Sequence, residues 1–93
     1  MLRDGPSYVM TLYIAGASRR SLRAVDNVRA FCEQELAGDY ALDVVDLYRS
    51  PDEARAAQIV AAPTLVRHKP DPPRRVIGDM SNLERLRQAI KVE

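Results

Sequence analysis

The chain has 93 residues, of which 46% are hydrophobic, and its 14 Lys and Arg residues nearly balance its 13 Asp and Glu residues, for a net charge of +1. This length and composition predict one globular domain, residues 1–93, with a single core and no cleft between domains. The balanced charge excludes the basic excess that is typical of proteins that bind nucleic acids or anionic membranes.

The first half of the chain predicts a strand, a helix and a second strand. Residues 8–15 and 41–48 are both rich in β-branched and aromatic side chains, which favours strands. Between them, Ser18 suits the N-cap of a helix that Gly38 ends. A strand, helix and strand of this length imply parallel pairing through a right-handed crossover. The helix side chains expected in the core recur every three or four residues, namely Leu22, Val25, Val28, Cys32 and Leu36.

The second half predicts a short helix, two strands and a closing helix. Ser50 and Glu53 fit a capping box with Pro51 at the first helical position, and this helix is expected to run to about residue 59. Residues 62–68 and 75–78 predict antiparallel strands joined by a proline-rich connector. The closing helix has a second capping box, Ser81 with Glu84, and an apolar stripe made of Leu83, Leu86 and Ile90.

The resulting order, βαβαββα, is that of a thioredoxin-like domain, an α/β fold with a four-stranded mixed sheet and helices on both faces. Such folds place a cis proline at the start of the third strand, where this chain has Ala62-Pro63-Thr64. We therefore expect a cis peptide bond before Pro63. A trans proline that simply begins the strand is the alternative.

Redox chemistry in this fold needs a thiol between the first strand and the first helix, where the helix N-terminus lowers the thiol pKa. Residues 15–21 contain none, and the single cysteine, Cys32, lies further along on the apolar stripe. We expect Cys32 to be a buried structural residue, and a redox protein that uses it is the alternative. The single histidine, His68, is expected at the surface.

These residues suggest no catalytic group, and one cysteine with one histidine cannot complete a metal site. We expect no cofactor and no metal. Residues 1–7 lack the basic segment and apolar run that are typical of a leader, so we expect none, and no apolar run approaches the roughly 20 residues needed to span a bilayer. We therefore expect a cytoplasmic protein.

Five segments are specific when taken together, although each alone is weak. They are Leu12-Tyr13-Ile14-Ala15-Gly16, Ser21-Leu22-Arg23-Ala24, Tyr40-Ala41-Leu42 with Val44-Val45-Asp46, Ala62-Pro63-Thr64-Leu65 and Arg74-Arg75-Val76-Ile77-Gly78-Asp79-Met80-Ser81. With these segments the chain resembles the KaiB family of circadian clock proteins. The resemblance extends from about residue 8 to about residue 90.

The resemblance implies a non-enzymatic protein that binds KaiC, a hexameric ring ATPase, on its N-terminal ring and modulates its phosphorylation cycle. KaiA-like and SasA-like clock proteins are further candidate partners, and neither nucleic acid nor membrane is expected. An alternative function is a free-standing sensor domain of the SasA type, which would bind the same ring without changing its fold.

The resemblance also implies a metamorphic chain. The second half of such a chain forms either helix, helix, strand in a homotetrameric ground state or strand, strand, helix in a thioredoxin-like monomer, two packings that differ by a few kcal/mol. The family commonly has Gly and Asp where this chain has Ala89 and Lys91. Ala in place of Gly favours helix by up to about 1 kcal/mol, and Lys near a helix C-terminus adds about 0.3–1 kcal/mol. We therefore expect the thioredoxin-like arrangement to dominate, with Pro63, Gly78 and Asp79 as further structural positions.

Candidate partner-binding residues are carried over from the family by position. Arg23 on the first helix and the pair Arg74 and Arg75 match positions associated with clock partners, although a basic pair can also be a solvated strand end. The segment 40–42 matches the entry to the second strand, and its residues are Tyr40, Ala41 and Leu42. The family usually has Lys where this chain has Asp43, so the charge at this contact is inverted, which can slow association with the usual partner or indicate a different one.

Overall fold

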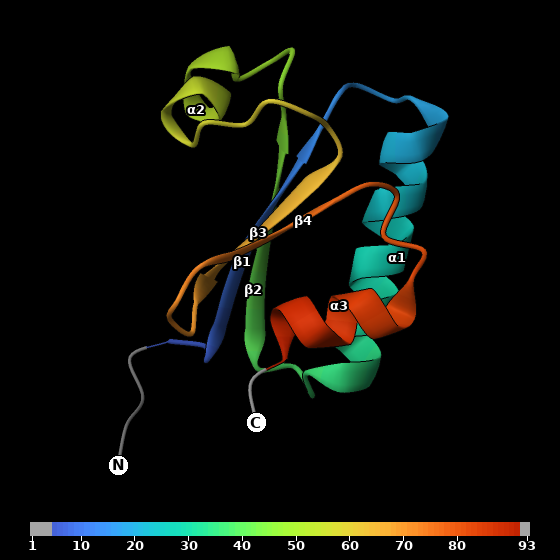
Figure 1. The fold of residues 1–93 in the computed structure, drawn as a ribbon, viewed down its shortest axis with the longest axis vertical. Coiled ribbons are helices and arrows are strands. Elements are labelled where there is room, and N and C mark those ends of the chain that lie inside the picture. The colour runs from blue at the N-terminus through green and yellow to red at the C-terminus, as the bar shows by residue number, and fades with distance from the viewer. Residues whose placement is uncertain (1–4, 92–93) are drawn as a thin grey trace.

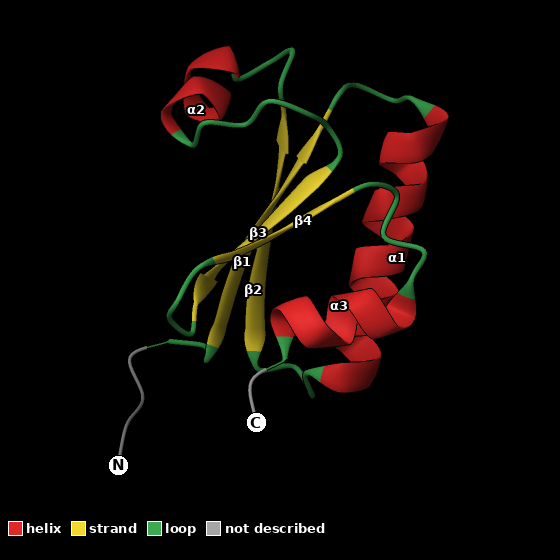
Figure 2. Cartoon of the chain, viewed as in Figure 1, coloured by secondary structure: helices red, strands yellow, loops and turns green. Residues whose placement is uncertain are grey.

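Within residues 5–91, four strands form one sheet in the order β2-β1-β3-β4, with three helices around it (Figures 1 and 2). The computed structural model describes residues 5–91. The predicted order βαβαββα is confirmed. Its elements are β1 (Tyr8–Ile14), α1 (Arg19–Glu35), β2 (Tyr40–Asp46), α2 (Pro51–Ala56), β3 (Thr64–Lys69), β4 (Arg74–Ile77) and α3 (Leu83–Ile90).

The strand β1 lies inside the sheet, with a parallel strand on one side and an antiparallel strand on the other. It runs parallel to β2 along its whole length, from the Tyr8/Tyr40 pair to the Ile14/Asp46 pair. It runs antiparallel to β3, which in turn is antiparallel to β4. The sheet is therefore mixed, and the predicted parallel unit with α1 as its crossover is confirmed.

The two faces of the sheet are covered unequally. Figure 1 shows α1 and α3 on one face, where they bury the larger core. On the other face a smaller cluster, Tyr13, Val45 and Val66, packs under the end of α2 and the segment that follows it. Because α2 is only six residues long, much of this second face stays open. We call it the α2 face.

The helix α1 begins where the sequence predicts, but its buried residues differ in part from the predicted ones. Ser18 caps it, since its side-chain oxygen accepts a hydrogen bond from the Ser21 backbone N–H. Leu22, expected in the core, is 52% exposed, whereas Phe31 is almost fully buried. The other predicted core positions on this helix are buried or half-buried. The predicted stripe is thus wrong at Leu22, and Ser21, Ala24 and Phe31 are buried in addition to the predicted residues.

Both capping boxes predicted for the second half are wrong. Ser50 does precede α2, and Pro51 is its first residue, but the Ser50 side chain makes no capping hydrogen bond and the helix ends at Ala56. The helix α3 is capped by Asn82, whose side-chain oxygen accepts from the Arg85 N–H at 3.1 Å, and Ser81 lies before the cap. Asn is as good an N-cap as Ser, and here it stands one residue closer to the helix.

The remaining differences are small. Leu83, expected on the apolar stripe of α3, is 42% exposed, whereas Leu86 and Ile90 are buried as predicted. The second strand begins one residue earlier than predicted and ends at Asp46. The peptide bond before Pro63 is cis, as predicted.

Candidate functional site

The segment 40–43 lies on the outer strand of the sheet. Because β2 is an edge strand, the backbone groups on its outer side have no ladder partner among the described residues. Its side chains alternate. Tyr40 and Leu42 are half-buried against the larger core, whereas Ala41 and Asp43 are exposed on the α2 face. An exposed edge of this kind can accept a further strand from another chain.

A shallow hollow of about 450 Å³ lies at the second half of β2 and reaches from the end of β1 to the start of α2. It brings Asp43 together with a second acidic group on the strand, Asp46, and with Glu53 on α2. Arg49 is the one basic residue among those that line it. The rim of this edge is therefore mainly acidic, which favours a basic contact from a partner.

Arg23 is exposed on α1, and the loop between β4 and α3 lies close to it. Hydrogen bonds from Ser81 lower the pKa of Asp79 in this loop, and the positive charges of Arg23 and Arg20 act in the same direction. The Asp79 backbone oxygen also accepts a hydrogen bond from the Asn27 side chain at 2.9 Å. The loop that leads into α3 is thus attached to α1.

Arg74 and Arg75 lie on β4, at the opposite edge of the sheet from β2. Both are exposed, but Arg75 is engaged within the chain, since its guanidinium donates to the backbone oxygens of Ala57 and Gln58 after α2. Its neighbour Arg74 makes no such contact with the described residues and lies on the other face of the sheet. The predicted partner-binding residues therefore do not form one continuous patch.

The junction between β1 and α1 contains hydroxyl groups in place of thiols. Ser21 is buried, and its oxygen accepts from the Ala15 N–H at 3.1 Å and from the Ser18 hydroxyl at 2.9 Å. Gly16 has φ +60°, and a Cβ there would lie only 3.2 Å from the Tyr48 ring. The carboxylate of Asp46 accepts from the N–H groups of both residues. The polar groups of this junction are therefore engaged in hydrogen bonds with one another.

Cys32 lies within the larger core and is fully buried. Burial raises the pKa of its thiol to about 11, so the reactive thiolate is scarce near neutral pH. Both observations disfavour the alternative of a redox protein that uses Cys32. His68 is exposed, as predicted, and its Nε2 lies 2.9 Å from the Thr11 hydroxyl.

Within residues 5–91, no group of three or more His, Cys, Asp or Glu side chains could hold a metal ion. None of the helices there is both long and apolar enough to cross a membrane.

A family model described as the KaiB domain matches residues 11–92. The chain belongs to the KaiB family. Two curated relatives named circadian clock oscillator protein KaiB are similar to it over most of its length. The one from Nostoc punctiforme is 42% identical over 92% of this chain and 83% of its own. The one from Prochlorococcus marinus strain MIT 9313 is 44% identical over 86% of this chain and 67% of its own.

Solved structures show the thioredoxin-like fold. The match to the N-terminal domain of SasA from Synechococcus elongatus has a TM-score of 0.75 at 20% identity, and it covers 95% of this chain and 86% of that domain. The match to mitochondrial thioredoxin 3 from Saccharomyces cerevisiae has a TM-score of 0.71 at 19% identity, and it covers 89% of this chain and 76% of that one. The predicted fold class is therefore confirmed for this KaiB-family chain.

The structural positions predicted in the second half each have a place in the structure. The Gly78 N–H donates to the Pro63 oxygen at 3.0 Å, so the end of β4 is tied to the start of β3. Gly78 has φ +121°, which a residue with a side chain rarely adopts. Ala89 packs half-buried against the larger core, and Lys91 is the C-cap residue of α3.

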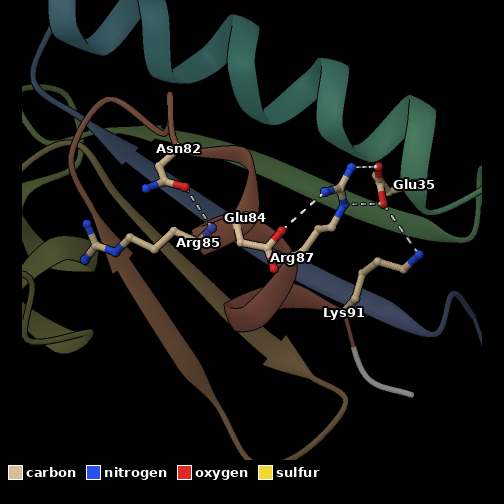
Figure 3. A network of polar contacts seen from close by, with 6 residues as sticks. All are labelled: Glu35, Asn82, Glu84, Arg85, Arg87 and Lys91. Atoms are coloured by element: carbon tan, nitrogen blue, oxygen red, sulfur yellow. Dashed lines mark hydrogen bonds and ion pairs between the residues drawn. The ribbon is translucent and has the colours of Figure 1, made fainter.

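A charged network between α1 and α3 was missed by the sequence analysis of this KaiB-family chain (Figure 3). Arg87 donates to both carboxylate oxygens of Glu35, at 3.0 and 3.2 Å, and it also lies 3.5 Å from Glu84. Lys91 lies 3.6 Å from Glu35. The hydrogen bonds from Arg87 lower the pKa of Glu35. Only the 84/87 spacing could be seen in the sequence, because Glu35 is 52 residues from Arg87.

Proposed function

We propose that this chain is a non-enzymatic clock module of the cytoplasm that docks on a KaiC-type hexameric ATPase and modulates its phosphorylation cycle. The observation that carries the proposal is KaiB-family membership in a chain whose β2 edge is open. Edge pairing and burial would supply affinity, and the charges at the rim would set the association rate and the choice of partner. KaiA-like and SasA-like proteins are the further partners of this proposal.

The same arrangement supports a binding role over catalysis. The junction where redox relatives of this fold hold a thiol has only serine hydroxyls, which are engaged with one another and with the backbone. The one thiol is buried in the core. We therefore assign the docking role to α1 at Arg23 and to β2 at residues 40–43, with Arg74 and Arg75 as the contacts at the other edge.

We further propose that the thioredoxin-like monomer is the main state of the free chain. In its support, residues 83–90 form a helix in which Ala89 is half-buried and Lys91 ends the last turn next to Glu35. Ala is the best helix former, and a cation near the helix C-terminus interacts favourably with the helix dipole. A homotetramer with the second packing would then be a minor state.

Asp43 sets the expected chemistry of the partner. It is exposed on the α2 face, and the hollow beside it is lined by two more carboxylates. A partner surface that suits the Lys more usual in the family would repel this rim, whereas a surface with a Lys or Arg opposite Asp43 would attract it. The KaiC-type ATPase of the same genome is expected to carry such a basic residue.

Size-exclusion chromatography of the full chain with that ATPase, in ATP and in ADP, tests the proposal. We expect nucleotide-dependent co-elution, and we expect Asp43→Lys to change the bound fraction. Asp71→Lys is the matched control, because it makes the same charge change at an exposed loop position away from β2. Absence of co-elution with both nucleotides would overturn the proposal, and equal effects of the two variants would remove Asp43 from the interface.

A free-standing sensor domain of the SasA type is the second candidate. It is favoured by the fold shared with the SasA N-terminal domain and by the helix-forming residues at the end of α3. Such a domain would bind the same ring but would keep one fold. Sedimentation and backbone chemical shifts, both measured at increasing concentration, separate the two. A tetramer whose chemical shifts are altered indicates the metamorphic module, and a monomer at every concentration indicates the sensor.

A further inference from the structure

Arg67 is a buried cation that the proposed function does not use. It lies on β3, on the sheet face that carries the larger core, and it is only 3% exposed. Within residues 5–91 its guanidinium forms no ion pair with a carboxylate. Burying a charge without compensation is costly, so its partners need to be identified.

The partners of Arg67 are backbone oxygens from two separate segments. One nitrogen, Nη1, donates to the oxygen of Ile90, the last residue of α3, at 2.9 Å. The other, Nη2, donates to the oxygen of Pro72 in the connector between β3 and β4. The carbonyls of the last helical turn have no partners within the helix and carry the negative end of its dipole. Arg67 therefore finds its compensating charge at the end of α3.

We infer that Arg67 is a clamp that holds α3 on the sheet and makes its release all-or-none. The Ile90 oxygen is available to Arg67 only when the last turn of α3 is both helical and docked. The Nε of Arg67 is buried and already has no hydrogen-bond partner among residues 5–91. If that turn detaches while the core stays closed, the guanidinium remains buried and loses one of its two acceptors as well. Partly detached states are thus penalised, and α3 is either docked or fully released.

The geometry requires arginine at this position. Its two bonds diverge from one planar group to acceptors 18 residues apart in the chain. The ammonium group of a lysine is a compact point charge on a flexible stem, and it cannot hold two acceptors in this fork. A lysine at position 67 would therefore keep the positive charge but lose part of the clamp.

Native-state amide hydrogen exchange of the free full chain tests the clamp. In Arg67→Met, the amides of α3 are expected to exchange about tenfold faster or more relative to those of α1, because two bonds made by a charged group are lost. Arg67→Lys is expected to give an intermediate increase. Arg74→Met is the matched control, since Arg74 is the cross-strand partner of Arg67 but is exposed. It should change the exchange rates of the α3 amides by less than about twofold.

The inference is overturned if the amides of α3 exchange at the wild-type rate in Arg67→Met, or if those of α1 and α3 accelerate by the same factor. If Arg67→Met does not fold, the Arg67→Lys variant decides by the same comparison of α3 with α1. The measurement is made without any partner, so its outcome does not depend on binding to a KaiC-type ATPase.

Discussion

The two halves of this protein are held in place by different kinds of interaction. The first half, β1, α1 and β2, is joined by a parallel ladder along the whole of both strands and by the apolar side of α1. The second half is also packed, but several of its elements depend on single arginines. Arg67 holds the end of α3, Arg75 holds the end of α2, and Arg87 joins α3 to α1.

This difference teaches that stability need not be distributed evenly in a chain of 93 residues. A ladder with an apolar core is a sum of many small contributions, so no single polar side chain decides it. An attachment made by one guanidinium can be removed by one substitution or by one competing contact. Regions that move in proteins are drawn from such weakly held parts.

The largest effect is expected in the first half, from Phe31→Ala. Phe31 is 1% exposed and lies among the residues of the larger core, so its truncation should lower the free energy of unfolding by about 3–5 kcal/mol. Leu22→Ala, on the same helix but half-exposed, should change it by no more than about 0.5 kcal/mol. Urea unfolding followed by circular dichroism measures both. Similar losses in the two variants would mean that α1 packs by the predicted stripe.

A smaller effect is expected in the second half from Arg75→Met. The variant loses the two hydrogen bonds to the backbone oxygens of Ala57 and Gln58 but keeps an apolar stem, and the cost should be about 1 kcal/mol. Hydrogen exchange should rise mainly around α2 and leave α1 unchanged. Arg74→Met serves as the control with the same charge change. An increase spread evenly over both halves would contradict the comparison.

The smallest effect is expected from Glu35→Gln, and it should depend on pH. Hydrogen bonds from Arg87 hold the pKa of Glu35 below its ordinary value, so its ionised form favours the folded state. This contribution is present above the ordinary Glu pKa of about 4.3 and is lost as the pH falls through the lowered pKa of the folded state.

Unfolding of wild type and Glu35→Gln between pH 7 and pH 3 measures this dependence. The wild type should be the more stable at pH 7, and the two curves should converge in acid. Glu33→Gln, which removes an exposed acid on the same helix, is the control, and its unfolding should depend on pH as that of the wild type does. Convergence at high pH in place of low pH would show that the assigned direction is wrong.

Local signals made much of the fold predictable. Alternation and β-branched residues located the strands, Ser18 located the start of α1, and the order of elements then implied the mixed sheet. The misses were of two kinds. Leu22 fits an apolar period as well as Phe31 does, and only packing decides which side of α1 is buried. Asn82 and Ser81 are both good caps, so a position could not be chosen from residue type.

Long-range polar contacts could not be predicted at all. Arg67 lies in a strand that the sequence predicts, but nothing near it in the sequence indicates that its acceptors are the oxygens of Ile90 and Pro72. The same holds for Glu35, whose partners lie on α3. For the candidate site, the sequence gives the residues by family position, whereas their separation onto two sheet edges follows only from the strand order.

The backbone chemical shifts of residues 74–90 in the free 93-residue chain test the arrangement of the second half most directly. We expect strand shifts for β4 and helical shifts across 83–90, with Arg67→Met reducing the helical shifts of α3 and leaving those of α1 in place. Extended shifts across residues 83–90 in the wild type would contradict this arrangement, since the second half would then be packed in another way.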